Sequence, residues 1–170
     1  AADAWLANWD VIGNGAAKEL NLKALADGTA LRIDTGGTLF LRAQGGRKTF
    51  GDVVEELDTL RDPRMNANAS EVFGQLTDEQ IAIGVQRIVA IDDAAIRRMV
   101  VDAMGDDADD IAETLIARKN YMARRYKAQL DALSGKAKPI DVPSVGIAPA
   151  QHKAVVEGRV NGYTILADKD

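Results

Sequence analysis

The sequence lacks the residues on which many reactive sites depend. It contains no cysteine, which excludes disulfides, thiolate metal sites, iron–sulfur clusters and cysteine nucleophiles. His152 is its single histidine, which excludes histidine-rich metal sites and makes most histidine-based acid–base catalysis unavailable. No apolar run approaches the ~18 residues of a membrane span, and no charged-then-apolar leader precedes Ala1. We therefore expect a soluble protein, cytoplasmic or part of a particle; a leader removed before Ala1 would leave no trace.

The overall composition favours a folded domain over disorder. The chain has 170 residues, of which 46% are hydrophobic, and this suffices for one compact domain with a core. Its 26 acidic and 21 basic residues give a formal net charge of −5. That charge opposes non-specific binding to nucleic acid or to an anionic membrane, so neither is an expected partner.

Helix signals concentrate in the middle of the chain. Thr77 and Gln80 form a capping box before an apolar stripe, which predicts a helix beginning there. Asp92 predicts the start of a second helix, which should end at Gly105. A third helix is predicted from the acidic residues at 106–110 to Leu133. The connections between these helices are very short, so neighbours should pack together.

Weaker helical spacing precedes these three helices. Residues 1–26 suggest two short helical pieces joined at a glycine turn. Residues 52–60 return to helical spacing and stop before Pro63. The polar, alanine-rich stretch 64–70 is predicted to be a loop.

Strand-like patterns lie near both ends of the chain. Alternating apolar residues around Thr35-Gly36-Gly37 predict a β-hairpin over 29–43. Three prolines predict an extended arm over 136–153. Two β-prone runs around Asn161-Gly162 predict a second hairpin over 154–170.

Together these patterns predict an α+β protein. Residues 1–135 should form a single compact domain with a body of three to four helices, and the two hairpins may join in one small sheet. The arm and the C-terminal hairpin should follow this domain. The alternative is an all-α bundle from which the two hairpins project as arms.

One short motif points to phosphate binding. Asp34-Thr35-Gly36-Gly37-Thr38 resembles the N-terminal phosphate loop of the sugar-kinase and hydantoinase superfamily, in which Asp-x-Gly-Gly-Thr lies in a β-hairpin. The resemblance implies a phosphate on the backbone amides and a metal on the aspartate. It covers only these residues, and nothing after Phe50 supplies the other loops of that superfamily. An ordinary tight turn selects the same residue types.

Two charged clusters follow within one predicted helix. The acidic cluster, at 106–113, suits the positive end of the helix dipole and lacks the ligand spacing of an EF-hand, so we expect no metal site. The basic cluster has an aromatic-plus-cation pattern that fits a partner-facing surface or, as an alternative, a nucleic-acid surface. Its residues are Arg118, Lys119, Arg124, Arg125 and Lys127, interleaved with Tyr121 and Tyr126.

No catalytic constellation is convincing. The only candidates for nucleophilic catalysis are Ser134 or Ser144 with His152, and the histidine falls in the predicted arm, where a base is poorly positioned. We therefore expect no catalytic residue and no cofactor.

The predicted function is that of a non-enzymatic structural or assembly subunit. Its arm and hairpins would be presented to protein partners in a homo- or hetero-oligomer, such as a viral or bacterial multi-protein assembly. The expected partner-binding residues are Trp5, Trp9, Arg118, Arg124, Arg125 and Tyr126. The alternative is a small phosphate- or nucleotide-binding enzyme centred on the Asp34–Thr38 turn.

Overall fold

The computed structural model describes residues 1–13, 21–24, 30–32, 34–105, 108–134, 159–160 and 163–164. The chain divides into two compact units, Ala1–Lys136 and Ala137–Asp170. The predicted arm over 136–153 lies outside the described residues. Within the described part, no helix is long and apolar enough to cross a membrane.

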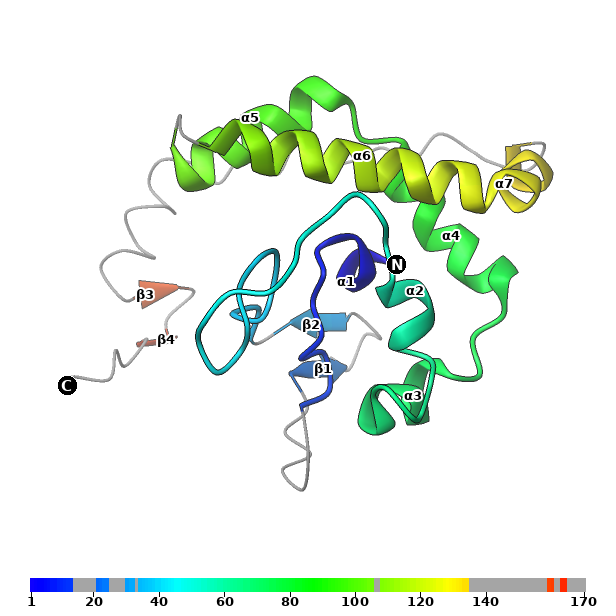
Figure 1. Ribbon diagram of the computed structural model, residues 1–170, viewed down its shortest axis with the longest axis horizontal. Coiled ribbons are helices and arrows are strands. Elements are labelled where there is room, and N and C mark those ends of the chain that lie inside the picture. Colours follow the sequence, from blue (N-terminus) through cyan, green and yellow to red (C-terminus); the bar gives the residue numbers. More distant parts are fainter. Residues whose placement is uncertain are drawn as a thin grey trace. The chain divides into compact units, whose positions relative to one another are not determined.

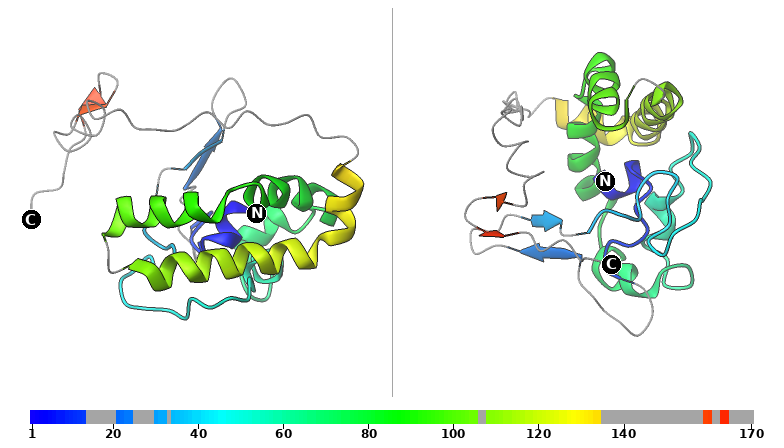
Figure 2. Two further views of the ribbon diagram at one scale, coloured as in Figure 1. Left: turned by 90° about the horizontal axis from the view of Figure 1, so that it is seen from above. Right: turned by 90° about the vertical axis from the view of Figure 1, so that its left-hand side faces the viewer.

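The larger unit is built from helices (Figure 1). More than half of the described residues lie in helices. In chain order the helices are α1 (Ala2–Trp5), α2 (Glu56–Thr59), α3 (Ala67–Phe73), α4 (Asp78–Val89), α5 (Asp93–Met104), α6 (Asp109–Arg125) and α7 (Lys127–Ser134). Figure 2 shows α5 alongside α6, and α6 also packs against α4 and α1.

The described strands form two separate pairs. β1 (Leu22–Ala24) runs antiparallel to β2 (Ala30–Arg32), with Lys23 opposite Leu31. β3 (Arg159–Val160) runs antiparallel to β4 (Tyr163–Thr164), with Val160 opposite Tyr163. No sheet joins the two pairs in the part of the chain that the structure describes.

The α+β prediction is therefore wrong, and the residues around Thr35–Thr38 show why. β2 pairs with β1, which precedes it in the chain, and not with residues 39–41, which follow it. Leu39 has a φ of 55°, which a strand residue cannot adopt, and its N–H donates to Leu6 O at 2.7 Å. The expected hairpin over 29–43 does not form, because Leu39 bonds the N-terminal segment, while Phe40 O accepts from Lys48 N–H and Leu41 forms a bridge with Arg47.

The helix-start signals are confirmed. Thr77 and Gln80 make both hydrogen bonds of the capping box at the start of α4. The Asp92 carboxylate accepts from Ala94 N–H at the start of α5, and Gly105, at a φ of 82°, ends that helix. These caps are local interactions, and the chain uses them as the sequence predicts.

Three other helix predictions need correction. The single helix expected up to Leu133 is divided at Tyr126 into α6 and α7. The helix expected over 52–60 is reduced to α2. The loop expected over 64–70 contains the start of α3, whose N-cap Asn66 accepts from Ala69 N–H at 3.0 Å.

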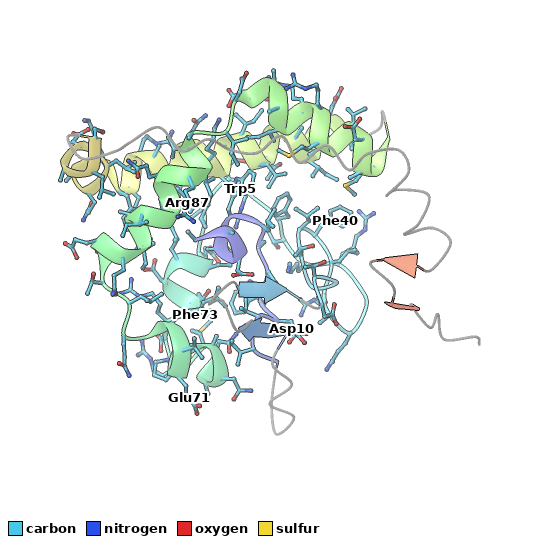
Figure 3. The ribbon with its side chains drawn as sticks, turned by 180° about the vertical axis from the view of Figure 1, so that it is seen from behind. Trp5, Asp10, Phe40, Glu71, Phe73 and Arg87 are labelled. Carbon is cyan, nitrogen blue, oxygen red and sulfur yellow. The ribbon has the colours of Figure 1, made fainter. Side chains whose placement is uncertain are left out.

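The main core forms where α1 meets α2, α4 and α6, and α5 adds to it by packing against α6. Trp5 lies at this meeting point and donates its indole N–H to Leu115 O at 2.8 Å, which satisfies its one polar group (Figure 3). Its buried neighbours are mostly aliphatic and come from every helix except α3 and α7: Ala4, Leu57, Ile81, Ala82, Val85, Ile88, Ile96, Val100, Ala112, Leu115 and Ile116. A smaller cluster of Val11, Ile12, Leu60 and Ala69 lies beside α3.

Arg118 joins this core to the irregular segments of the chain. Its side chain is among the most buried in the described part, at 1% exposure. All five guanidinium N–H groups find acceptors at 2.6–2.9 Å: the backbone oxygens of Ala4, Trp5, Gly51 and Val53, and the Glu56 carboxylate. One side chain of α6 thus fixes α1, the start of α2 and the loop between residues 51 and 53.

Lys119 makes a comparable connection on the next residue of α6. Its ammonium donates to Ile91 O at 2.6 Å and pairs with Asp93, at the junction of α4 and α5. Because Lys119 is buried, this pair is shielded from bulk water on one side. Neighbouring residues of α6 therefore hold opposite parts of the fold.

Replacing Arg118 should be the most damaging single change in this network. Arg118→Met leaves Glu56 and four backbone oxygens without their donors, and should lower the free energy of unfolding by roughly 3–5 kcal/mol. Urea denaturation followed by circular dichroism measures this. The control is Arg97→Met, which removes an exposed pair with Glu113 and should cost less than about 1 kcal/mol. Equal losses in the two variants would contradict the assigned role of Arg118.

Removing the hydroxyl of Tyr126 is expected to leave stability unchanged or to raise it, in contrast to replacing Arg118. Tyr126 is 1% exposed, and its hydroxyl has no hydrogen-bond partner in the described part of the chain. Burial also raises the pKa of this hydroxyl. Because an unsatisfied buried polar group is destabilising, Tyr126→Phe should leave stability unchanged or raise it by about 1 kcal/mol. The control is Tyr121→Phe, because Tyr121 is only partly buried and its hydroxyl is not a buried, unpartnered group, so its removal should give no gain. A clear loss in Tyr126→Phe would refute the prediction.

Candidate functional site

A cleft of about 790 Å³ is lined by residues of the larger unit. It lies in the larger unit, between the segment after α1, the turn at 34–37, the loop at 42–49 and the ends of α2 and α3. Figure 3 shows Asp10, one of its residues, beside the β1–β2 pair. The described lining residues are Trp9, Asp10, Gly13, Asn21, Asp34, Gly37, Arg42, Ala43, Gln44, Gly45, Lys48, Thr49, Glu55, Glu56, Met65 and Asn66.

Trp9 and Glu56 form a fixed wall of this cleft. The indole N–H of Trp9 donates to one Glu56 oxygen at 3.3 Å, and Arg118 donates to the other at 2.6 Å. Asn66, the N-cap of α3, donates to Trp9 O at 3.1 Å. Glu56 thus orients the Trp9 ring, Arg118 holds Glu56, and Asn66 holds the Trp9 backbone.

Lys48 holds the opposite wall. Its ammonium donates to Ala7 O and to Gly37 O, both at 2.5 Å, and so ties the N-terminal segment to the Asp34 turn. Burial lowers the pKa of Lys48, while the nearby Glu56 carboxylate raises it. The net effect is a lowered pKa for an ammonium whose position is fixed by two backbone oxygens.

The Asp34–Thr38 turn borders the cleft in a compact form. The Asp34 carboxylate accepts from Gly36 N–H at 2.8 Å, and Thr38 N–H donates to Thr35 O at 3.1 Å. Two of the amides that a phosphate would need are therefore engaged within the turn. This is the hydrogen bonding of an ordinary Asx turn, the other explanation of the motif.

Gly37 lies in close contact with the N-terminal segment and with the loop at 42–49. A Cβ on Gly37 would lie 3.3 Å from the Cβ of Asp10 and 3.5 Å from that of Ala43. A larger residue at position 37 would require Asp10 to shift by a few tenths of an ångström. The glycine therefore has a packing role in addition to any ligand role.

Three of the six expected partner-binding residues are buried in the interior of the larger unit. Trp5, Arg118 and Tyr126 are all buried, with their side chains committed to the core. Trp9 is half-buried in the cleft wall, and Arg124 and Arg125 are exposed on α6. The basic cluster is thus not one continuous surface, because helical spacing turns Arg118 and Lys119 inward.

The exposed part of the basic cluster is largely paired. Arg125 contacts both oxygens of Asp58 at 2.5 and 2.7 Å, and Lys127 contacts Asp131 at 2.6 Å. The hydrogen bonds from Arg125 lower the pKa of Asp58 below 3.8. This pair therefore stabilises the fold above that pH, and the stabilisation is lost as the pH falls through the lowered pKa. Arg124 has no such partner within the described part of the chain.

The acidic cluster is only partly described, because Asp106 and Asp107 lie outside the described residues. Asp109 and Asp110 occupy the first turn of α6, as expected from the helix dipole. Glu113 pairs with Arg97 of α5 at 2.8 Å. Within the described residues no group of three acidic, histidine or cysteine side chains could hold a metal ion.

Sequence reasoning missed most of the cleft. Asp10, Lys48, Glu55 and Glu56 are single charged residues in unremarked positions, and only the folding of the N-terminal segment onto α2 brings them together. No spacing rule connects them. The only signal available beforehand was the glycine-rich turn, which is one edge of the cleft.

Adjacent arginines on α6 provide a matched test of the Asp58 pair. Arg125→Glu places a second carboxylate beside Asp58 and should lower the free energy of unfolding by about 1 kcal/mol at low salt, with a smaller loss at high salt. Arg124→Glu, also exposed in the last turn of α6, should cost only the loss of its helix-dipole interaction, about 0.3 kcal/mol. Thermal denaturation at two salt concentrations measures both, and an equal loss in the two variants would contradict the pairing.

Comparison with known proteins gives no relative for this chain. No family model matches it, and neither the curated proteins nor the solved structures contain a significant match. Its function must therefore be argued from its own residues.

Proposed function

We propose that this chain is a non-enzymatic assembly subunit that binds a protein partner through residues 137–170. The observation that carries this proposal is the division of the chain at Lys136. The second unit is shorter than the ~40 residues below which a domain usually needs disulfides, metals or oligomerisation to fold. The chain has no cysteine and one histidine, so disulfides and histidine-rich metal sites are not available to this unit, and a protein partner would supply the missing stability.

The composition of residues 137–170 supports this proposal. Its four basic and four acidic residues cancel, so the net charge of −5 belongs to the larger unit. Low net charge reduces the repulsion that keeps surfaces apart. Its large apolar residues are Ile140, Val142, Val145, Ile147, Val155, Val156, Val160, Tyr163, Ile165 and Leu166.

The described strands of this segment offer a means of contact. Among the described residues, β3 pairs with β4 and neither pairs with a third strand, and the outer edge of such a strand pair offers backbone groups to a further strand. A single two-stranded pair is marginally stable in water. Addition of a strand from a partner would satisfy those groups and extend the pair into a sheet.

The phosphate-binding alternative has less support. The Asp34–Thr38 turn engages two of its own amides, and the Lys48 ammonium is committed to Ala7 O and Gly37 O. Neither group is free to hold a phosphate without first breaking these bonds. A nucleotide titration by thermal shift should therefore leave the melting temperature unchanged.

Removing residues 137–170 should separate folding from association. The truncated chain, residues 1–136, should keep a cooperative thermal transition, because the caps and the Arg118 network all lie within it. Its mass by sedimentation should be that of a monomer, while the full chain sediments as an oligomer or binds its partner. A monomeric full chain without a partner in its native source, or a truncated chain with no cooperative transition, would refute the proposal.

Point variants in the full chain refine this test. Val160→Asp and Tyr163→Asp introduce charge at facing positions of β3 and β4 and should abolish association. Met99→Asp is the control, because Met99 is 50% exposed on α5 in the larger unit. If Met99→Asp disrupts association and the strand variants do not, the contact surface lies on the helices.

A further inference from the structure

We propose that the 790 Å³ cleft between Trp9, Asp34 and Glu55 binds a neutral, polyhydroxylated ligand, that is, a saccharide. This inference is independent of the assembly role proposed for residues 137–170. It concerns a different part of the chain and a small-molecule ligand. Its volume falls within the roughly 300–1,000 Å³ of ordinary ligand clefts.

Several polar groups of the cleft are already satisfied and serve as its walls. Both Glu56 oxygens are occupied by Arg118 and Trp9. Asn66 uses its carbonyl oxygen to cap α3 and its amide to bind Trp9 O. Because these groups are held by the protein, they fix the shape of the cleft rather than its ligand.

Asp10 and Asn21 are partly buried and joined by hydrogen bonds from the Asn21 amide. The exposed polar groups of the lining are of both hydrogen-bonding types. Arg42 uses only its Nε in a described hydrogen bond, which leaves its terminal N–H groups as donors. Gln44 and Thr49 can donate and accept, and Glu55 can only accept. No described hydrogen bond or ion pair engages the side chains of Gln44, Thr49 or Glu55. A ligand must therefore both donate and accept within one small space.

The charges of the lining oppose a strongly charged ligand. Carboxylates come from Asp10, Asp34 and Glu55, and cations from Arg42 and Lys48. The carboxylates would repel a polyanion such as a nucleotide, and the two cations would repel a polyamine. Hydroxyl groups can donate to carboxylates and accept from guanidinium or amide groups, and they carry no charge to desolvate.

The apolar part of the lining suits the carbon face of a sugar ring. Trp9 is half-buried, and its ring is held in place by hydrogen bonds from its own N–H and to its backbone oxygen. Met65, 58% exposed, lies on the same lining. A flat indole beside planar carboxylate, amide and guanidinium groups provides both stacking and paired hydrogen bonds to neighbouring hydroxyls.

The test is direct binding to the full chain. The probes are glucose, galactose, mannose, xylose, fucose and N-acetylglucosamine, with the tetramers cellotetraose, maltotetraose, mannotetraose, xylotetraose and chitotetraose. Saturation-transfer difference NMR detects weak binding, and calorimetry measures the affinity of any sugar that binds. At least one probe should bind with a Kd at or below about 1 mM, with the strongest saturation on its ring C–H protons.

Three variants locate the bound sugar. Glu55→Gln and Gln44→Ala change exposed groups and should weaken binding about tenfold with the fold unchanged. Trp9→Ala should abolish binding, and circular dichroism checks that it folds. The matched control is Glu79→Gln, an exposed carboxylate on α4 outside the cleft, which should bind like the unaltered chain.

Three results would overturn the proposal. One is failure of every probe to bind. Another is sugar binding that none of the three cleft variants weakens, which would place the ligand elsewhere. The third is that ATP or spermine binds, that the three cleft variants weaken this binding, and that no sugar competes with it. The cleft would then bind a charged ligand. All three leave the assembly proposal untouched, because the sedimentation experiment tests that separately.

Discussion

The Arg118 guanidinium is the interaction on which the rest of the larger unit depends. It lies on the longest helix, and its five hydrogen bonds reach α1, the loop at 51–53 and Glu56 of α2. None of these short segments has enough internal hydrogen bonding to be stable alone, since α1 and α2 are single turns. The buried charge is tolerated because every donor is satisfied and Glu56 neutralises it.

The same interaction shapes the cleft. Glu56 binds Arg118 with one oxygen and Trp9 with the other, so the core and the cleft wall share a carboxylate. Lys48 then fixes the opposite wall by joining Ala7 to Gly37. The cleft therefore forms because these hydrogen bonds attach the irregular segments to the helices. Its walls are held by hydrogen bonds, whereas Gln44, Thr49 and Glu55 have no described side-chain hydrogen bond.

Burial redistributes the charges that look most conspicuous in the sequence. Arg118 and Lys119 turn into the fold, Arg125 meets Asp58 across the surface, and only Arg124 stays without a partner within the described residues. The basic cluster thus divides into two buried connections, Arg118 and Lys119, two surface ion pairs, Arg125 and Lys127, and the exposed Arg124. Its five cations therefore do not form one continuous surface.

By itself, the sequence determined the starts of α4 and α5 and the end of α5, because Thr77, Asp92 and Gly105 act on backbone groups within a few residues. Tertiary structure decided the rest. Leu39 leaves the strand conformation to bond Leu6, which removes the expected hairpin, and Arg118 becomes a core residue because partners more than 60 positions away supply its acceptors. Such distant contacts leave no local pattern, since spacing along the chain reports only on neighbours.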